Sequence, residues 1–179
     1  FFQNAFDSEV SGLDVVATYR QNWTNCSNTD FMVSYNYNQK IITKEKPFVD
    51  STGAAGSFFD GEFYYDYKHN TPRWRSVVSA NHHIGPVSLL VRANIFGKYA
   101  NLYAPDSTVI QHYKGKVQTD LEVNWEVDDH YTLTVGGRNV FDKYPDRDKI
   151  GRFVNGQIYA DGPIDWQGGF YFAKIAAKF

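Results

Sequence analysis

The sequence predicts an antiparallel transmembrane β-barrel, of which residues 1–179 would form about seven strands. Three observations carry this prediction. Apolar and polar residues alternate with a period of two in seven segments, the connections between these segments alternate between short and long, and the chain ends on phenylalanine. A strand with one face in lipid and the other in a watery lumen needs this alternation, and outer-membrane barrels have short turns at one end and long loops at the other.

Composition narrows the function classes. The formal net charge is −2, which gives no electrostatic case for binding nucleic acid. The mean hydropathy is −0.48, and no run approaches the roughly 18 apolar residues of a membrane helix. A membrane β-barrel is compatible with this value because only every second residue of its strands meets lipid. The single cysteine, Cys26, cannot form an intrachain disulfide.

Seven segments follow the two-residue period, and we predict each as a strand. They are 12–23, 30–42, 73–84, 87–99, 118–127, 131–138 and 166–179. In 118–127, the residues Leu121, Val123 and Trp125 share one face. Acidic residues share the other face, namely Asp120, Glu122 and Glu126. Helical spacing with capping residues is not sustained in any segment, so the sequence predicts no helix.

The connections fix the direction of the strands. Short connections at 24–29, 84–86 and 128–130 alternate with long ones at 44–72, 100–116 and 141–165. Because the long loops of outer-membrane barrels face outside, we expect Trp166 near the outer aromatic girdle and Phe179 at the periplasmic rim. An open sheet of seven strands would leave two unpaired edges in lipid. We therefore expect further strands from an upstream segment or another chain.

At residues 133–145 the chain resembles the C-terminal part of a TonB-dependent outer-membrane receptor. That family carries an Asn-Leu-Phe-Asp-Lys-x-Tyr-Pro-like element at the top of its penultimate strand, and the match here is one residue shorter, with Val in place of Leu. The matching residues are Asn139, Phe141, Asp142, Tyr144 and Pro145. The strand entries at 11–14 and 71–75 and the ending at 163–179 are also similar to the family, so the resemblance covers most of the chain in order.

The resemblance implies a 22-stranded barrel around a plug domain, with these strands as its last seven and the plug absent from this chain. It implies an active-transport receptor in the outer membrane of a Gram-negative bacterium, which binds a scarce nutrient and imports it with TonB energy. The nutrient would be an iron–siderophore, haem, cobalamin or an oligosaccharide. The implied partners are the TonB complex, reached through the missing plug, outer-membrane lipid and the barrel-assembly machinery, which would recognise Phe179 together with Ile175 and Tyr171.

Aromatic side chains in the long loops are the predicted ligand contacts, because they offer large and rigid surfaces. We select Tyr64, Tyr65, Tyr99 and Tyr103 from a larger set that also holds Phe58, Phe59, Tyr67, Tyr113 and Tyr159. The alternative is that these rings pack the loops together. Arg92, like Arg73 and Arg75, would attract an anionic ligand, although the sequence favours pairing of these arginines with acidic lumen residues.

The sequence predicts no enzyme, cofactor or metal site. His82 and His83 are adjacent in a strand and point to opposite faces, which disfavours a shared zinc ion. The acidic residues of the long third loop, Asp142, Asp146 and Asp148, lack the order of a calcium loop. The carboxylates of 118–127 are better explained as a lumen wall paired with residues such as Thr132, Thr134 and Arg138.

Two alternatives remain at this level. One is a small outer-membrane barrel enzyme or adhesin that is completed by oligomerisation. The other is a soluble glycan-binding β-sandwich, in which Leu121, Val123 and Trp125 would be buried against a second sheet.

Overall fold

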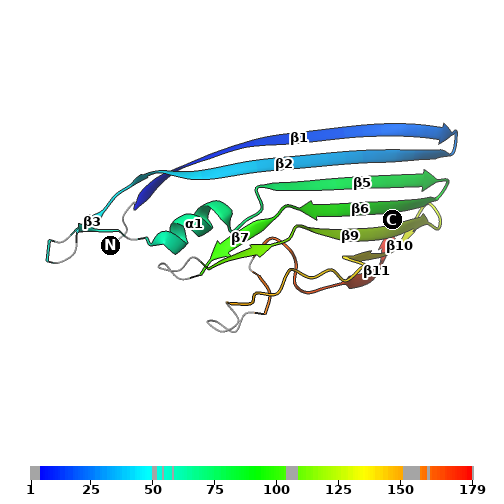
Figure 1. The fold of residues 1–179 in the computed structure, drawn as a ribbon. Helices are drawn as coiled ribbons and strands as arrows, with labels where there is room; N and C mark the ends of the chain where they lie inside the picture. The colour runs from blue at the N-terminus through cyan, green and yellow to red at the C-terminus, as the bar shows by residue number, and fades with distance from the viewer. Residues whose placement is uncertain are drawn as a thin grey trace.

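The structure is a computed structural model that describes residues 5–49, 52–53, 55–57, 59–103, 109–150, 158–160 and 162–178. Seven strands form one antiparallel sheet (Figure 1). In spatial order they are β1 (Phe6–Thr24), β2 (Ser27–Glu45), β5 (Trp74–Ile84), β6 (Val87–Phe96), β9 (Lys116–Glu126), β10 (Tyr131–Arg138) and β11 (Phe170–Ala177). The seven predicted strands are confirmed, although β6 ends at Phe96 and β11 begins at Phe170, inside the predicted ranges 87–99 and 166–179.

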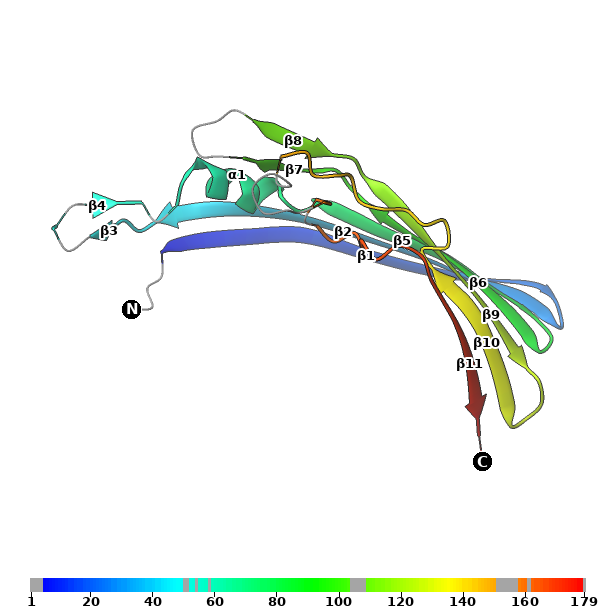
Figure 2. The same ribbon diagram turned by 90° about the horizontal axis from the view of Figure 1, so that it is seen from below.

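The sheet is open, with β1 and β11 at its two edges. Figure 2 shows that it is twisted and curved, so that the C-terminal strands turn away from β1 and β2. A fraction of a barrel wall has this form, because a closed barrel would require a partner strand at both edges.

Smaller elements gather at the end of the sheet where the long connections lie (Figure 1). They are the pair β3 (Phe48–Val49) and β4 (Ala55–Gly56), the helix α1 (Gly61–His69), and the hairpin of β7 (Tyr99–Leu102) and β8 (Ile110–Tyr113). Since this end carries the long loops, we call it the outer end. Among the described residues, no helix is long and apolar enough to cross a membrane.

The helix α1 contradicts the prediction that the chain has none. Asp60 caps it, because its carboxylate accepts a hydrogen bond from the Phe63 N–H at 2.9 Å. Glu62 lies in the first turn, and Lys68 and His69 lie in the last, as the helix dipole favours. The residues between these charges are mostly aromatic. Aromatic residues also favour strands, so the sequence pattern does not indicate a helix of this length.

The two faces of the sheet differ as the alternation predicts. Val123, Trp125 and Ile175 share the apolar face, and their side chains are 43%, 47% and 74% exposed. In the part of the chain that the structure describes, no second sheet packs on them. The β-sandwich alternative is therefore wrong.

Strand lengths and aromatic residues both fit a membrane span. Strands β5 and β9 have 11 residues each and β6 has 10, and a tilted transmembrane strand needs about 9–11. On the apolar face, Tyr35 stacks on Trp74 near the outer end. Near the short turns, the Trp23 Nε1–H donates to Thr29 Oγ1 at 2.8 Å, and that hydroxyl is 2.7 Å from His82 Nδ1. Aromatic side chains therefore mark both ends of the span, as membrane interfaces require.

Candidate functional site

Helix α1 folds onto the polar face of β2 rather than away from the sheet. The Lys40 Nζ atom lies 5.9 Å from the centroid of the Tyr67 ring. Lys40 shares a face of β2 with Asn38 and Asn36, and Asn36 donates to the Asp14 carboxylate on β1. The Phe6 ring contacts Tyr67 as well, at 5.5 Å between centroids. The helix therefore covers the outer end of the polar face.

A cavity of 460 Å³ lies between α1 and this polar face, and we call it the polar-face cavity. Four cationic side chains line it, namely Lys40, Lys68, Arg73 and Arg75, together with Asn36, Asn38, Phe96 and Pro163. No carboxylate among the described residues lines it. Arg75 stands directly opposite Asn36 on one side and Phe96 on the other in the sheet register, so these side chains share one face.

The sequence favours pairing of Arg73, Arg75 and Arg92 with carboxylates, and the structure shows other surroundings for them. Arg75 lies over the Phe96 ring, with its Cζ 5.0 Å from the centroid. Within the described ranges, Arg73, Arg75 and Arg92 make no salt bridge with a carboxylate. The predicted pairing with lumen carboxylates is therefore not found among the described residues and stays a prediction. The lining of the polar-face cavity does not compensate its own charge.

Arg92 lies outside this cavity, further along the polar face of β6. It stands opposite Asp120 in the register. The Asp120 carboxylate accepts hydrogen bonds from Asn94 Nδ2 and from the Asn139 N–H, each at 3.0 Å. Next to it, the Thr134 hydroxyl donates to Asn124 Oδ1 at 2.7 Å. This network agrees with the predicted lumen wall of polar pairs between strands.

The four selected tyrosines do not converge on one site. Tyr65 and Tyr99 line a second cavity, of 760 Å³, at the outer ends of β5, β6 and β9. Tyr64 lies near Glu45, and the Glu45 carboxylate raises the pKa of the Tyr64 phenol. The Tyr103 hydroxyl donates to Asp148 Oδ2 at 2.5 Å, and burial raises the pKa of Tyr103 far above its usual value.

Several loop aromatics pack the outer layer together. A buried cluster joins the hairpin to the segment before β11, and its members are Phe96, Tyr99, Tyr113, Ala160 and Ile164. Tyr113 is only 1% exposed, and its hydroxyl lies 2.8 Å from that of Tyr103. Tyr99, Tyr103 and Tyr113 therefore pack within the outer layer, and the role of Tyr99 and Tyr103 as ligand contacts stays a prediction. Phe58 lies outside the described residues.

A salt bridge ties the third long loop to the start of β9. The Lys116 Nζ atom is 2.6 Å from Asp146 Oδ1, and the Lys114 N–H donates to Asp146 Oδ2 at 2.7 Å. Burial acts to raise the pKa of Asp146, but these hydrogen bonds and the lysine charges outweigh it and lower that pKa. The contact holds the loop over the polar face.

The residues of the motif at 139–145 form a turn that ends β10. Asn139 has φ +49°, and its side chain accepts from the Lys143 N–H and donates to the Lys143 carbonyl, each at 2.9 Å. Asp142 has φ +54°, and its carboxylate accepts from the Gly169 N–H at 2.9 Å. Both residue types tolerate this left-handed conformation and bond their own backbone in turns.

The remaining motif residues support the same turn. Pro145 is buried, whereas Phe141 is 64% exposed. The Tyr144 ring stacks on Tyr159 at 5.5 Å, and Asp142 raises the pKa of the Tyr144 hydroxyl. The motif positions the connection between β10 and β11 and contributes no side chain to the polar-face cavity.

The adjacent histidines and the C-terminal strand complete the set of residues singled out from the sequence. His82 contacts Thr29, whereas His83 Nε2 lies 3.7 Å from Asp30 Oδ2, so the two rings contact different partners. The described residues contain no cluster of three or more His, Cys, Asp and Glu side chains arranged to hold a metal ion. Tyr171 and Ile175 are exposed on the edge strand β11, at 66% and 74%. Phe179 lies outside the described residues.

Residues 1–140 match the family model described as TonB dependent receptor-like, β-barrel. The chain belongs to this family. Membership implies an outer-membrane receptor that works as a transporter, with a plug domain and TonB as functional partners. No curated protein and no solved structure matches the chain.

The matched region includes every strand except β11, and it ends at Val140, inside the motif that carried the resemblance. Sequence reasoning missed Lys40 and Lys68, because it placed no helix over the polar face. The signal that marks α1 was present, with Asp60 as a cap and charges of the favourable sign at both helix ends.

Proposed function

We propose that this chain forms the C-terminal wall of a TonB-dependent receptor that imports an anionic iron chelate, either an iron–siderophore complex or haem. The plug and the other strands would come from the rest of the receptor and pair with the edges at β1 and β11. Residues of the polar-face cavity would make the first contact with the chelate at the outer end of the barrel.

The observation that supports this proposal is the charge of the polar-face cavity. Four cations line it, and none of its described lining residues carries a carboxylate. A cleft lined by charges of one sign concentrates its field and raises the local concentration of a ligand of opposite sign. Anionic chelates and the carboxylates of haem fit such a field, whereas uncharged oligosaccharides and cobalamin gain little from it.

The wall below the cavity suits passage of such a ligand. Polar side chains continue along the same face of β6 and β9, where Arg92 stands opposite Asp120 and Asn94 stands opposite Gln118. No covalent chemistry is required of these groups. They would replace the hydration of a polar ligand while TonB, drawing on the inner-membrane proton gradient, moves the plug.

The test is equilibrium binding to the complete receptor purified in detergent, followed by tryptophan fluorescence quenching. The probes are a ferric catecholate siderophore, a ferric hydroxamate siderophore, haem, cyanocobalamin and maltoheptaose. We expect the double variant Arg73→Gln and Arg75→Gln to weaken the preferred anionic probe by about tenfold, the effect of two partly exposed charges.

The matched control is Lys174→Gln with Lys178→Gln, which removes two exposed lysines of β11 and its end. The control should bind as the unchanged receptor does. Preferred binding of cyanocobalamin or maltoheptaose, or equal losses in the two double variants, would reject an anionic chelate as the ligand.

A further inference from the structure

Helix α1 forms part of the wall of both cavities. Lys68 lines the polar-face cavity, whereas Tyr65 and His69 line the second cavity. The two cavities also share Arg73 and Phe96 as lining residues, so they adjoin each other beside the helix. A movement of α1 would therefore widen or narrow both cavities at once.

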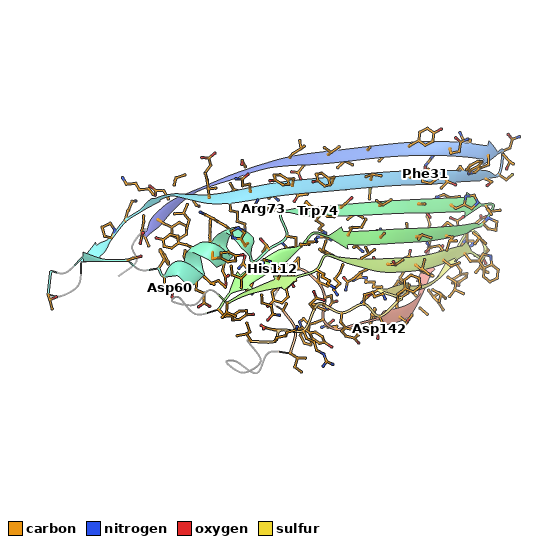
Figure 3. All side chains as sticks on the ribbon, in the orientation of Figure 1. Phe31, Asp60, Arg73, Trp74, His112 and Asp142 are labelled. Carbon is orange, nitrogen blue, oxygen red and sulfur yellow. The ribbon has the colours of Figure 1, made fainter. Side chains whose placement is uncertain are left out.

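Few buried contacts hold this helix. None of its nine residues (Gly61–His69) is buried. It packs on β7 and β2, and in Figure 3 it runs from Asp60 towards Arg73, where the chain enters β5. Segments with little buried surface open locally at a small fraction of the global stability. Helix α1 can therefore lift from the cavities while the sheet stays folded.

A carboxylate joins α1 to the β7–β8 hairpin. Asp66 Oδ1 accepts a hydrogen bond from the Leu102 N–H at 2.8 Å, across a separation of 36 residues in the chain. Leu102 is buried at the end of β7, so its N–H needs an acceptor when the helix is docked. This bond is a tertiary contact, and it breaks when the helix lifts.

The surroundings of Asp66 oppose its negative charge. Docking takes the carboxylate partly out of water, and this burial is the largest cause of its raised pKa. The carboxylates of Glu62, which lies four residues earlier in the helix, and of Asp60 raise the pKa further. The Leu102 N–H and His69 lower the pKa of Asp66, but they do not cancel the increase.

The other charged groups around α1 face different parts of the helix. From β2, Lys40 lies over the Tyr67 ring, and Glu45 lies near the first turn. Strand β7, which the structure describes in full, has Tyr99 as its one titratable side chain. Among the described residues, the groups that act on the pKa of Asp66 include no lysine or arginine. Water is therefore the main stabiliser of this charge, and docking removes part of that water.

We propose that protonation of Asp66 locks α1 over the two cavities. The neutral carboxyl group keeps an oxygen that accepts from the Leu102 N–H, and it no longer repels Glu62 and Asp60. The docked form binds a proton more tightly than the lifted form, in which Asp66 is in water. As pH falls through the raised pKa of the docked form, docking becomes more favourable, and as pH rises above it the helix lifts more often.

This latch regulates the site to which the proposed function assigns the iron chelate, and only this consequence rests on the proposed function. An anionic chelate in the polar-face cavity lies between α1 and the sheet, so its release requires the helix to lift. A locked helix should therefore slow the dissociation of the chelate. The latch itself needs no ligand and can be measured without one.

Hydrogen exchange of the complete receptor in detergent, without ligand, tests the latch. The amides of α1 are compared at about pH 5 and about pH 7.5, which bracket a raised carboxyl pKa, and the rates are corrected for the intrinsic effect of pH. We expect the protection of α1 to be about threefold higher in acid, the effect of one partly screened charge. The amides of β6 should not respond.

Two substitutions of Asp66 separate its charge from its hydrogen bond. Asp66→Asn keeps an acceptor oxygen without the charge, so α1 should be protected at the higher pH as it is in acid. Asp66→Ala removes the acceptor, and α1 should lose protection at both pH values. The matched control is Asp129→Asn, which removes an exposed carboxylate at the short turn between β9 and β10 and should keep the acid response. The absence of an acid response in the unchanged receptor, or its persistence in Asp66→Asn, would overturn the proposal.

Dissociation of a bound chelate tests the consequence for the site. The probes are haem and a ferric catecholate siderophore, both measured at about pH 7.5, where the unchanged receptor and Asp66→Asn differ most in the charge of this residue. We expect the bound probe to leave Asp66→Asn about threefold more slowly, in proportion to the rarer lifting of α1. Protection of α1 with an unchanged dissociation rate would reject the regulation and keep the latch. If neither probe binds, the proposed function fails, and the exchange result still decides whether the latch exists.

Discussion

The spanning part of the sheet and the outer layer use aromatic and charged residues in opposite ways. From β5 to β10, large apolar side chains are exposed on one face and polar side chains bond each other across the strands of the other face. In the outer layer, Tyr99 and Tyr113 are buried, whereas Lys68, Arg73, Lys98 and Lys114 are exposed, as in a water-soluble domain. One chain therefore folds against two solvents.

The boundary between the two regions is narrow. Trp74 and Val117 belong to the apolar face, and the buried ring of Phe96 is level with them on the polar face. The hairpin that carries Tyr99 and Tyr113 begins only three residues beyond Phe96. Gly97 and Gly115 lie at this boundary, where the strands bend and leave no room for a side chain. The comparison shows how to locate the membrane surface on this chain. It lies where large apolar side chains change from exposed to buried.

A charge placed on the apolar face should have the largest effect. Val91 lies in the middle of β6 and is 39% exposed. We expect Val91→Arg to lower the free energy of unfolding by about 2–4 kcal/mol, because a guanidinium at the bilayer midplane is poorly solvated. The measurement is a urea titration of the receptor folded into lipid vesicles.

The adjacent residue supplies the control. Leu90 lies on the polar face, opposite Glu122 in the register. Leu90→Arg should change the free energy of unfolding by less than about 1 kcal/mol, because the new charge meets water and a carboxylate. Similar losses at both positions would show that the two faces do not meet different solvents.

Closing the bend at the boundary should have the second largest effect. We expect Gly115→Ala to destabilise the outer layer by about 1–3 kcal/mol, since the added methyl overlaps the Phe96 carbonyl oxygen. Hydrogen exchange of the amides of β8 and of the start of β9 measures it. Gly61→Ala, at the first residue of α1, should not destabilise, because alanine favours helix. A Gly115→Ala variant with unchanged exchange would contradict the crowding at this bend.

Loss of the helix cap should have a smaller and local effect. Asp60→Ala removes the acceptor of the Phe63 N–H, and we expect α1 to lose about 1 kcal/mol of local stability. Faster exchange of the amides of α1, with β5 to β10 unchanged, is the expected result. Asp60→Asn keeps an acceptor and should restore most of the protection. Equal losses in the two variants would mean that the cap does not hold this helix.

The pH dependence of the third long loop should be the smallest effect. The pKa of Asp146 is lowered in the folded chain, so its contribution to stability is present above the ordinary carboxyl pKa and is lost as pH falls through the lowered value. We expect less than about 1 kcal/mol, because both partners are partly exposed. The readout is the exchange of the Lys114 amide, corrected for the intrinsic effect of pH. Asp146→Asn should remove the acid-dependent loss, and an unchanged loss in that variant would assign it to another group.

Much of the sheet follows from the sequence because its signal is local. Residues such as Leu121, Val123 and Trp125 alternate with carboxylates at a spacing of two, and that spacing alone assigns both the strand and its two faces. The turn residues Asn139 and Asp142 were found as a motif, but their role in closing β10 depends on bonds to Asp120 and Gly169 from other segments. The helix was missed because its charge signals are short and its aromatic residues also favour strands.

The sequence by itself determined the strand set, the strand faces and which connections are long, since these depend on neighbours a few residues apart. Only the tertiary structure decided which charges gather in a cavity. Lys40, Lys68 and Arg75 come from β2, α1 and β5, and their proximity depends on how α1 folds back onto the sheet. The same holds for the second cavity, whose lysines and apolar residues are brought together by the bend at Gly97 and Gly115. Long-range packing of this kind leaves no periodic trace in the chain, so residue spacing cannot reveal it.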